Sequence, residues 1–157
     1  QLSVAAAETI WSRFEAFRAQ RPLVPFLAKV TDADLRGCGL SFAKIRSIRA
    51  IGEAADRGQL ESGRLMHMGH GERTACLTEI PGVGPWTADM IGIFYFCDSD
   101  VWPENDITVQ KTMQKLIGKR RKTTLAAGKF QPHRSLLARY MWKIADASPD
   151  SNINSSR

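Results

Sequence analysis

The sequence LTEIPGVGPWTADMIGIFYFCDSDVWPENDITVQ spans residues 77–110 and decides the fold. Its residues 81–85, PGVGP, cannot continue a helix, because glycine tolerates positive φ and proline lacks an N–H donor. They predict a tight turn between two helices. The residues that follow, 86–97, are apolar around most of a helix circumference, and this pattern predicts a buried helix.

Helical signals dominate the rest of the chain, and alternating strand patterns are scarce, so the sequence predicts an all-α fold. Thr31-Asp32 is predicted to cap a short helix over residues 33–36, and Ser41 is the predicted N-cap of a longer helix from residue 42. Four glycines between residues 58 and 71 mark a looser region, in which His67 and His70 are expected to be solvated. Further helices are expected over residues 2–19, 26–30, 72–79, 107–117 and 132–145.

Length and composition indicate one globular domain. The 157 residues, 43% of them apolar, fit the usual size of about 100 to 200 residues per domain. No apolar run approaches the roughly 18 residues that cross a bilayer, and the first residues lack signal-peptide features. We therefore expect no membrane partner and an intracellular location, in the bacterial cytoplasm or nucleoid, or in a nucleus. The chain begins without Met and in helical periodicity, so residues 1–157 are expected to be a single helical core that lacks upstream residues.

The three cysteines do not indicate a metal site. Cys38, Cys76 and Cys97 are far apart and lack the paired spacings of zinc or iron–sulfur ligands. They are expected to be buried free thiols.

Positive charge is concentrated in one part of the chain. Residues 107–143 hold ten Lys or Arg and no Asp or Glu. Since the whole chain has 22 basic and 16 acidic residues, the remainder carries 12 basic and 16 acidic ones. A basic block on a mildly acidic body favours a polyanion such as DNA or RNA as the partner, and a solvated basic face is the alternative.

The glycine-rich turn is a candidate phosphate site. Backbone N–H groups at the start of the helix from Pro85 favour an anion, and glycines let a phosphate approach closely. The candidate residues are Gly82, Val83, Gly84 and Thr87. A plain helix–helix turn is the alternative interpretation.

The stretch LTEIPGVGPWTADMI followed by DVWPENDITVQ resembles the helix-hairpin-helix DNA glycosylase superfamily, and more narrowly its alkylated-base branch, the 3-methyladenine DNA glycosylase II group. GLSFAKIRSIRAI and PHRSLLARYMW resemble two further family helices, and the similarity covers residues 1 to about 142. The resemblance implies a two-lobed helical core with a helix-hairpin-helix motif over residues 72–97 and a basic helical part over 107–147. It also implies a monomer that binds double-stranded DNA containing damaged bases and acts in base excision repair.

Asp106 follows Trp86 by 20 residues, which is the family spacing of the catalytic carboxylate. Cleavage of the bond between the sugar and the base passes through an oxocarbenium-like state, which a carboxylate stabilises while it orients or deprotonates water. The alternative is that Asp106 only caps the helix over residues 107–117, a task that Asn105 could also perform.

Trp86 occupies the position at which bifunctional relatives place a lysine that forms a Schiff base. The sequence therefore predicts a monofunctional glycosylase without lyase activity. The resemblance places Trp86, Met90 and Trp142 in the pocket for the flipped base, where indoles would stack on a cationic, N-alkylated purine whose glycosidic bond is already weakened. Core packing is the alternative for both tryptophans.

The resemblance implies further contacts at the DNA backbone and within the opened base stack. Gln1 or Leu2 aligns with the side chain that fills the vacated stack, and Arg134 and Ser135 align with a position near the DNA backbone, although Arg134 could equally form a surface salt bridge. No cofactor is expected to be required and no iron–sulfur cluster is expected. A structural Na⁺ or K⁺ at the hairpin would be held by backbone carbonyls of Thr78, Ile80 and Val83.

Three functions remain open from the sequence. The first is an alkylpurine DNA glycosylase, the second a glycosylase for deaminated or mismatched bases, and the third a non-catalytic helix-hairpin-helix module that binds DNA. The combination of Trp86, Asp106 and Trp142 favours an enzyme, because a binding module would need only the hairpin and the positive charge.

Overall fold

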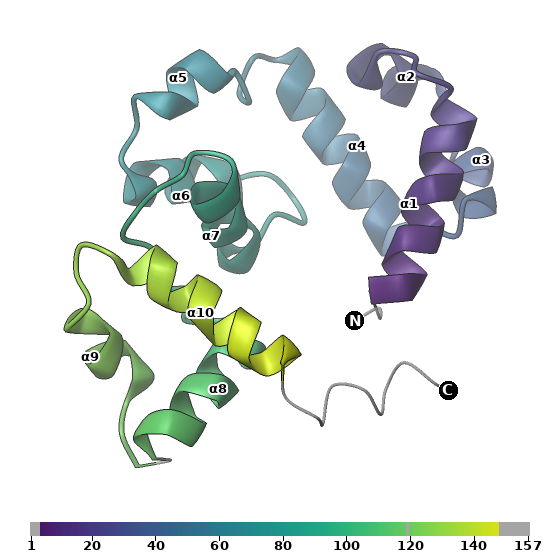
Figure 1. Cartoon of the computed structure of the whole chain (residues 1–157). Coiled ribbons are helices and arrows are strands. Elements are labelled where there is room, and N and C mark those ends of the chain that lie inside the picture. The colour runs from purple at the N-terminus through teal and green to yellow at the C-terminus, as the bar shows by residue number, and fades with distance from the viewer. Residues whose placement is uncertain (1–3, 119, 148–157) are drawn as a thin grey trace. The chain divides into compact units, whose positions relative to one another are not determined.

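A computed structural model describes residues 4–118 and 120–147. Gln1 and Leu2, predicted to fill the vacated base stack, lie outside the described part. All regular structure in the described ranges is helical, which confirms the predicted fold class (Figure 1). The helices are α1 (Val4–Arg18), α2 (Leu23–Lys29), α3 (Asp32–Gly37), α4 (Phe42–Asp56), α5 (Ser62–Met66), α6 (His70–Thr78), α7 (Pro85–Phe94), α8 (Ile107–Ile117), α9 (Thr123–Gly128) and α10 (Arg134–Asp146). None of these helices is both long enough and apolar enough to cross a membrane.

The chain folds into two compact units. Unit 1 comprises the described residues of Gln1–Gly69 together with Ala75–Val83, and unit 2 comprises His70–Thr74 and the described residues of Gly84–Arg157. The chain therefore passes between the units just before α6, again within α6, and again in the turn between α6 and α7. In the described part of the chain, every helix except α6 lies within a single unit.

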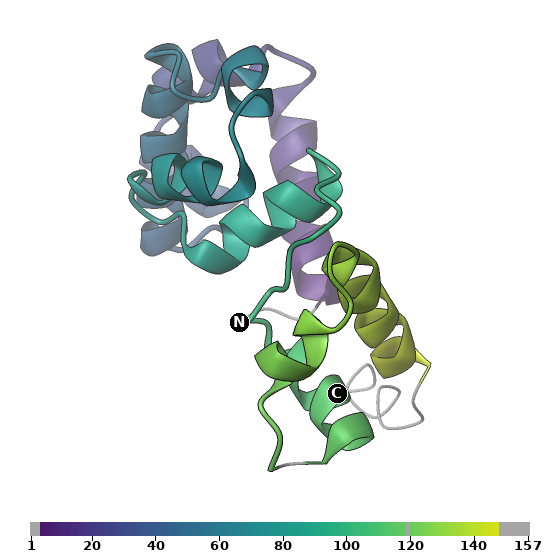
Figure 2. The same cartoon turned by 90° about the vertical axis from the view of Figure 1, so that its left-hand side faces the viewer.

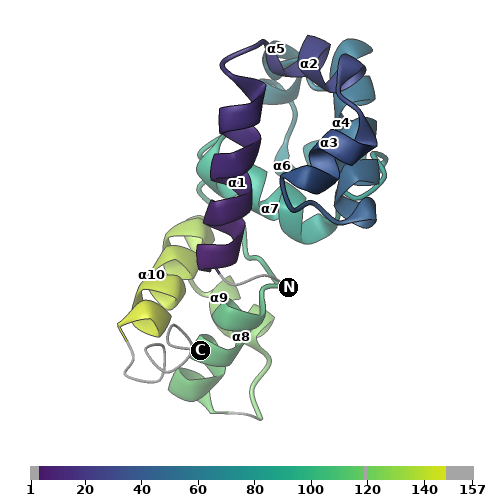
Figure 3. The ribbon, with the colours of Figure 1, turned by 90° about the vertical axis from the view of Figure 1, so that its right-hand side faces the viewer.

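Unit 1 is built around α4, against which α2 and α3 pack (Figure 3). Both predicted caps are found, because the Thr31 side chain accepts from the N–H of Asp34 and the Ser41 side chain accepts from the N–H of Lys44, although Asp32 is the first residue of α3 and not part of its cap. Each such cap stabilises a helix by roughly 1 kcal/mol. The core consists of Phe14, Phe26, Leu27, Val30, Leu35, Cys38 and Ile45.

Unit 2 contains the mutually packed helices α8, α9 and α10 (Figure 2). Their shared core consists of Trp102, Val109, Met113, Ala127, Ala138 and Met141. Helix α8 spans the residues predicted from the sequence, 107–117, and Asp106 is its N-cap. Of the basic residues in the predicted 107–147 part, Lys111 and Lys115 lie on α8 and Arg134, Arg139 and Lys143 lie on α10, whereas Arg120, Arg121 and Lys122 lie between α8 and α9.

Helix α7 differs from the prediction in length and in burial. It ends at Phe94 rather than at residue 97, and only Ala88, Gly92 and Ile93 are buried. Trp86 is 48% exposed and Phe94 is 58% exposed, so the prediction of a wholly buried helix was wrong. The apolar residues of α7 thus form two faces, one that packs in the core and one that is exposed and largely aromatic.

Two smaller predictions were also wrong. His70 is the first residue of α6 and contacts two carboxylates, so it is not a solvated loop residue. The thiol of Cys97 is exposed, whereas Cys38 is buried as expected and Cys76 is intermediate. Glycine spacing misled the first prediction, because α5 and the start of α6 form within the glycine-rich region.

Candidate active site

The turn after α6 requires glycine at position 82. Gly82 has φ +90°, and a Cβ built on it would lie 2.0 Å from Oγ of Ser47 and 3.2 Å from the Ser47 Cα. The turn therefore packs directly on α4 of unit 1. The buried Val83 follows, and its N–H donates to the carbonyl of Ile80 over 3.0 Å.

Gly84 begins α7 as its N-cap, and no side chain caps the N–H groups of the first turn. A Cβ at Gly84 would meet no other atom within 4 Å, so space next to this helix end is open. Uncapped N–H groups beside open space are suited to a phosphate oxygen. The phosphate contacts predicted for Gly82, Val83, Gly84 and Thr87 remain predictions.

Asp106 is joined to both helices that flank residues 95–106. Its side chain is buried, at 7% exposed, and its Oδ1 accepts from the N–H of Val109 in α8 over 2.8 Å. Its Oδ2 accepts from Nε1 of Trp86 in α7, also over 2.8 Å. The two donors and the N-terminus of α8 complement a negative charge on this carboxylate. The N-cap alternative is thus confirmed, and it coexists with a contact to the exposed Trp86 indole.

The exposed face of α7 is apolar and largely aromatic. Trp86, Met90 and Phe94 follow one another at intervals of four residues, which places them on the same side of the helix. The ring of Phe94 packs on Trp142 of α10, with centroids 5.6 Å apart and planes inclined by 32°. Trp142 is partly buried and also packs against the unit 2 core. Phe94 is not among the predicted pocket residues, although its spacing of eight residues from Trp86 places it on the same face of a helix.

Helix α10 holds the backbone of residues 98–101. Nε of Arg134 donates to Oδ1 of Asp100 over 2.6 Å, and this hydrogen bond lowers the pKa of Asp100 and raises that of Arg134. The buried Ser135 hydroxyl donates to the carbonyl of Asp98 over 2.6 Å and accepts from the N–H of Val101 over 2.9 Å. Arg134 thus forms the salt bridge considered as an alternative, and Ser135 contacts protein backbone. Their DNA contacts remain predictions, and the buried hydroxyl does not favour the one proposed for Ser135.

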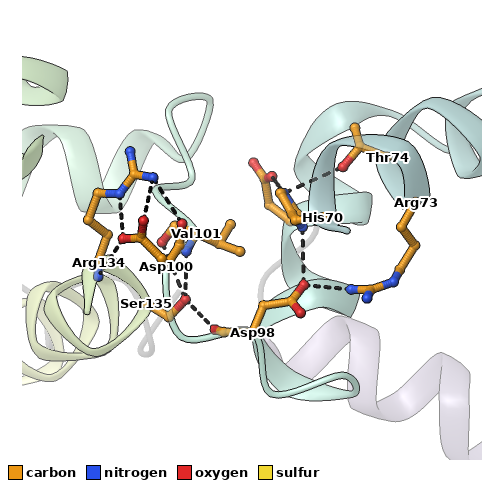
Figure 4. Close-up of polar contacts among 9 residues, drawn as sticks. His70, Arg73, Thr74, Asp98, Asp100, Val101, Arg134 and Ser135 are labelled. Atoms are coloured by element: carbon orange, nitrogen blue, oxygen red, sulfur yellow. Dashed lines mark hydrogen bonds and ion pairs between the residues drawn. The ribbon is translucent and has the colours of Figure 1, made fainter. Parts of the chain in front are cut away.

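A polar cluster of unit 2, which local sequence patterns did not predict, lies at the other side of the same segment (Figure 4). The buried Arg73 donates to Oδ2 of Asp98 over 2.5 Å, and its guanidinium lies 3.8 Å from the ring centroid of Phe96. His70 shares a hydrogen bond of 3.0 Å with Asp89 through Nε2, and its buried Nδ1 lies 3.3 Å from Oδ2 of Asp98 without the geometry of a hydrogen bond. Burial raises the pKa of Asp89, and the hydrogen bond with His70 offsets part of that rise.

The predicted cation ligands belong to unit 1. The carbonyl of Ile80 already accepts from Val83, which leaves one lone pair for an ion. Among the described residues, no group of three or more His, Cys, Asp or Glu side chains could hold a metal ion. The backbone cation at Thr78, Ile80 and Val83 stays a prediction.

Comparison with known proteins identifies the family. The chain is 31% identical to DNA-3-methyladenine glycosylase 1 of Schizosaccharomyces pombe, over 92% of this chain and 67% of that protein. The chain belongs to the helix-hairpin-helix DNA glycosylase superfamily, in its alkylated-base branch. It is also 29% identical to the alkylbase DNA glycosidase-like protein mag2 of the same yeast, over 92% of this chain and 72% of that protein. None of the protein-family models compared with the chain matches it.

Solved structures agree with this family. A crystal structure of a DNA-3-methyladenine glycosidase from Bacillus halodurans superposes with a TM-score of 0.82 at 30% identity, over 94% of this chain and 70% of that one. A 3-methyladenine DNA glycosylase of Schizosaccharomyces pombe, solved in complex with abasic DNA, also gives a TM-score of 0.82, at 28% identity over 94% of this chain and 76% of that one. The helical fold of this chain is therefore the fold of the family.

Proposed function

We propose that this protein is a monofunctional DNA glycosylase of base excision repair, which binds damaged double-stranded DNA as a monomer and releases alkylated bases such as 3-methyladenine. The observation that carries the proposal is the hydrogen bond from the exposed Trp86 indole to the buried Asp106 carboxylate, 2.8 Å long. This hydrogen bond joins two groups that the reaction needs. The indole offers a surface on which a base can stack, and the carboxylate can stabilise a cationic sugar. The family relationship and the abasic-DNA complex of a relative support the same assignment.

In the proposed mechanism the damaged nucleotide leaves the duplex and its base stacks on the exposed face of α7. A base inside a duplex is inaccessible, so this extrusion precedes the chemistry. Electron-rich rings such as those of Trp86 and Trp142 attract an N-alkylated purine, because it carries positive charge. As the glycosidic bond breaks, Asp106 stabilises the positive charge that develops on the sugar and orients water towards it. The alkylated base is a good leaving group, so little general-acid assistance is needed.

The lyase reaction of bifunctional relatives requires an amine, and the residue at that position is Trp86. The indole nitrogen donates its hydrogen to Asp106 and has no basic lone pair with which to attack the sugar. The product is therefore an abasic site in an intact strand. Borohydride treatment during turnover should trap no covalent complex of protein and DNA, and a trapped complex would contradict the monofunctional assignment.

The catalytic test must separate the chemical role of Asp106 from its two hydrogen bonds. In Asp106→Asn, the amide oxygen can still accept from Val109, but the amide nitrogen then faces the indole N–H of Trp86. The decisive comparison is therefore Trp86→Phe against Trp86→Phe/Asp106→Asn, in which that conflict is absent. We expect the added Asn to slow base release by about 100- to 1000-fold. Equal rates of the two variants, with both folded and bound to DNA, would show that Asp106 is only a cap.

The lesion class is tested separately with the unaltered protein. Methylated duplex DNA should lose 3-methyladenine, whereas a duplex with a single uracil or hypoxanthine should remain intact at the same enzyme concentration. Release of the deaminated bases alone would favour the second function, and binding without any release would favour a non-catalytic module.

A further inference from the structure

Asp98 is bonded through all three of its polar groups. Its carboxylate contacts Arg73 and His70, its N–H donates to the carbonyl of Gly92 over 2.9 Å, and its carbonyl accepts from Ser135. Figure 4 shows His70 and Arg73 pointing at Asp98 from one side and Ser135 from the other. All these residues belong to unit 2. The first residue of the segment that leads to Asp106 is therefore held from two directions.

His70 connects this residue to α7. Its Nε2 bonds to Asp89, which lies on α7 between Trp86 and Gly92, while its Nδ1 faces Asp98. The imidazole lies directly over the helix, because a Cβ added to Gly92 would come within 2.7 Å of Nδ1 and 2.9 Å of the Asp98 Oδ2. One ring thus bridges a carboxylate of α7 and the carboxylate of the following segment.

The backbone just before Asp98 needs such a restraint. Cys97 has φ 57°, a left-handed conformation that is unfavourable for a residue other than glycine. Unfavourable backbone conformations of this kind persist where the surrounding structure holds them in place. The exposed Cys97 side chain provides no anchor, so the contacts of Asp98 supply the restraint.

The segment from Asp98 to Asp106 is tightly connected along its length. Val101, Trp102 and Pro103 are buried, and the N–H of Asp106 donates to the carbonyl of Pro103 over 3.0 Å. A shift at its beginning is therefore passed on to its end. We propose that His70 is a positioning residue for base release, because it ties residues 98–106 to α7 and thereby fixes Asp106 against Trp86. This role rests on the proposed glycosylase function.

The test uses His70→Ala with His67→Ala as its matched control, since His67 is exposed and directly follows α5. We expect His70→Ala to slow single-turnover release of 3-methyladenine about tenfold, since misplacement of a reacting group by about 1 Å can cost 100-fold. The Kd for a duplex with an abasic site should stay within about twofold, because the residues that bind the backbone are untouched. His67→Ala should match the wild type. His70→Gln retains a hydrogen-bond donor and most of the volume, so it should recover part of the rate.

Hydrogen exchange gives a second readout that does not depend on activity. Amides within residues 98–106 should exchange faster in His70→Ala than in the wild type, and those of α9 should not. Unchanged exchange in this segment, or an unchanged rate of release, would overturn the positioning role. If His70→Ala fails to fold, His70→Gln must show the smaller rate loss and the faster exchange. If the wild type releases no base at all, the proposed function fails, and the exchange experiment still decides whether His70 holds the segment.

Discussion

The hydrogen bond between Trp86 and Asp106 can be removed with little loss of aromatic surface by Trp86→Phe. The phenyl ring still stacks a base, but Oδ2 of Asp106 loses its donor while Oδ1 keeps the N–H of Val109. A hydrogen bond to a charged group contributes about 1.5–3 kcal/mol, and the carboxylate is only 7% exposed, so water replaces the donor poorly. If the whole contribution is felt in the transition state, release should slow by about 10- to 150-fold.

The assay is single-turnover release of 3-methyladenine from methylated duplex DNA with the enzyme in excess, so that product release does not limit the rate. Trp11→Phe is the matched control, because Trp11 is exposed on α1 and lies outside the segment that carries Asp106. That variant should keep the wild-type rate. A Trp86→Phe enzyme that is folded and as fast as the wild type would refute the view that the indole donor organises the carboxylate.

Two further predictions concern stability. Gly82→Ala should lower the free energy of unfolding by about 2–4 kcal/mol, because it combines a positive φ with overpacking against Ser47. Gly84→Ala should lower it by less than about 1 kcal/mol, because a Cβ there meets no other atom within 4 Å. Urea denaturation of both variants checks these values. Asp100→Asn should destabilise the protein at neutral pH. The hydrogen bond from Arg134 lowers the pKa of Asp100, so the stabilisation is present above the ordinary carboxyl pKa and is lost as pH falls through the lowered value. The unfolding temperatures of the wild type and of Asp100→Asn should therefore differ at neutral pH and become equal in acid.

Local signals in the sequence were sufficient to predict where the helices with side-chain caps begin. Thr31, Ser41 and Asp106 each begin a helix at the expected place, because a capping side chain acts within three residues of its own position. The positive φ of Gly82 was likewise anticipated from the PGVGP turn, but its packing on Ser47 was not, since 35 residues separate the two in the sequence.

Contacts between distant residues explain what the sequence could not predict. His70 lies among glycines in the sequence, and its role depends on Asp89 and Asp98, which are 19 and 28 residues away. Apolar periodicity in α7 indicated burial, yet it cannot distinguish a side chain that packs in a core from one that is exposed to receive a base. Trp86 and Phe94 are of the second kind.

The two hydrogen bonds of Asp106 have an evolutionary consequence. One oxygen accepts from a backbone N–H and the other from an indole N–H, and only a carboxylate offers acceptors on both sides. Selection for a correctly started α8 and an ordered Trp86 therefore preserves the acid at this position independently of selection for catalysis. The presence of an acid at this position therefore does not by itself establish catalytic competence.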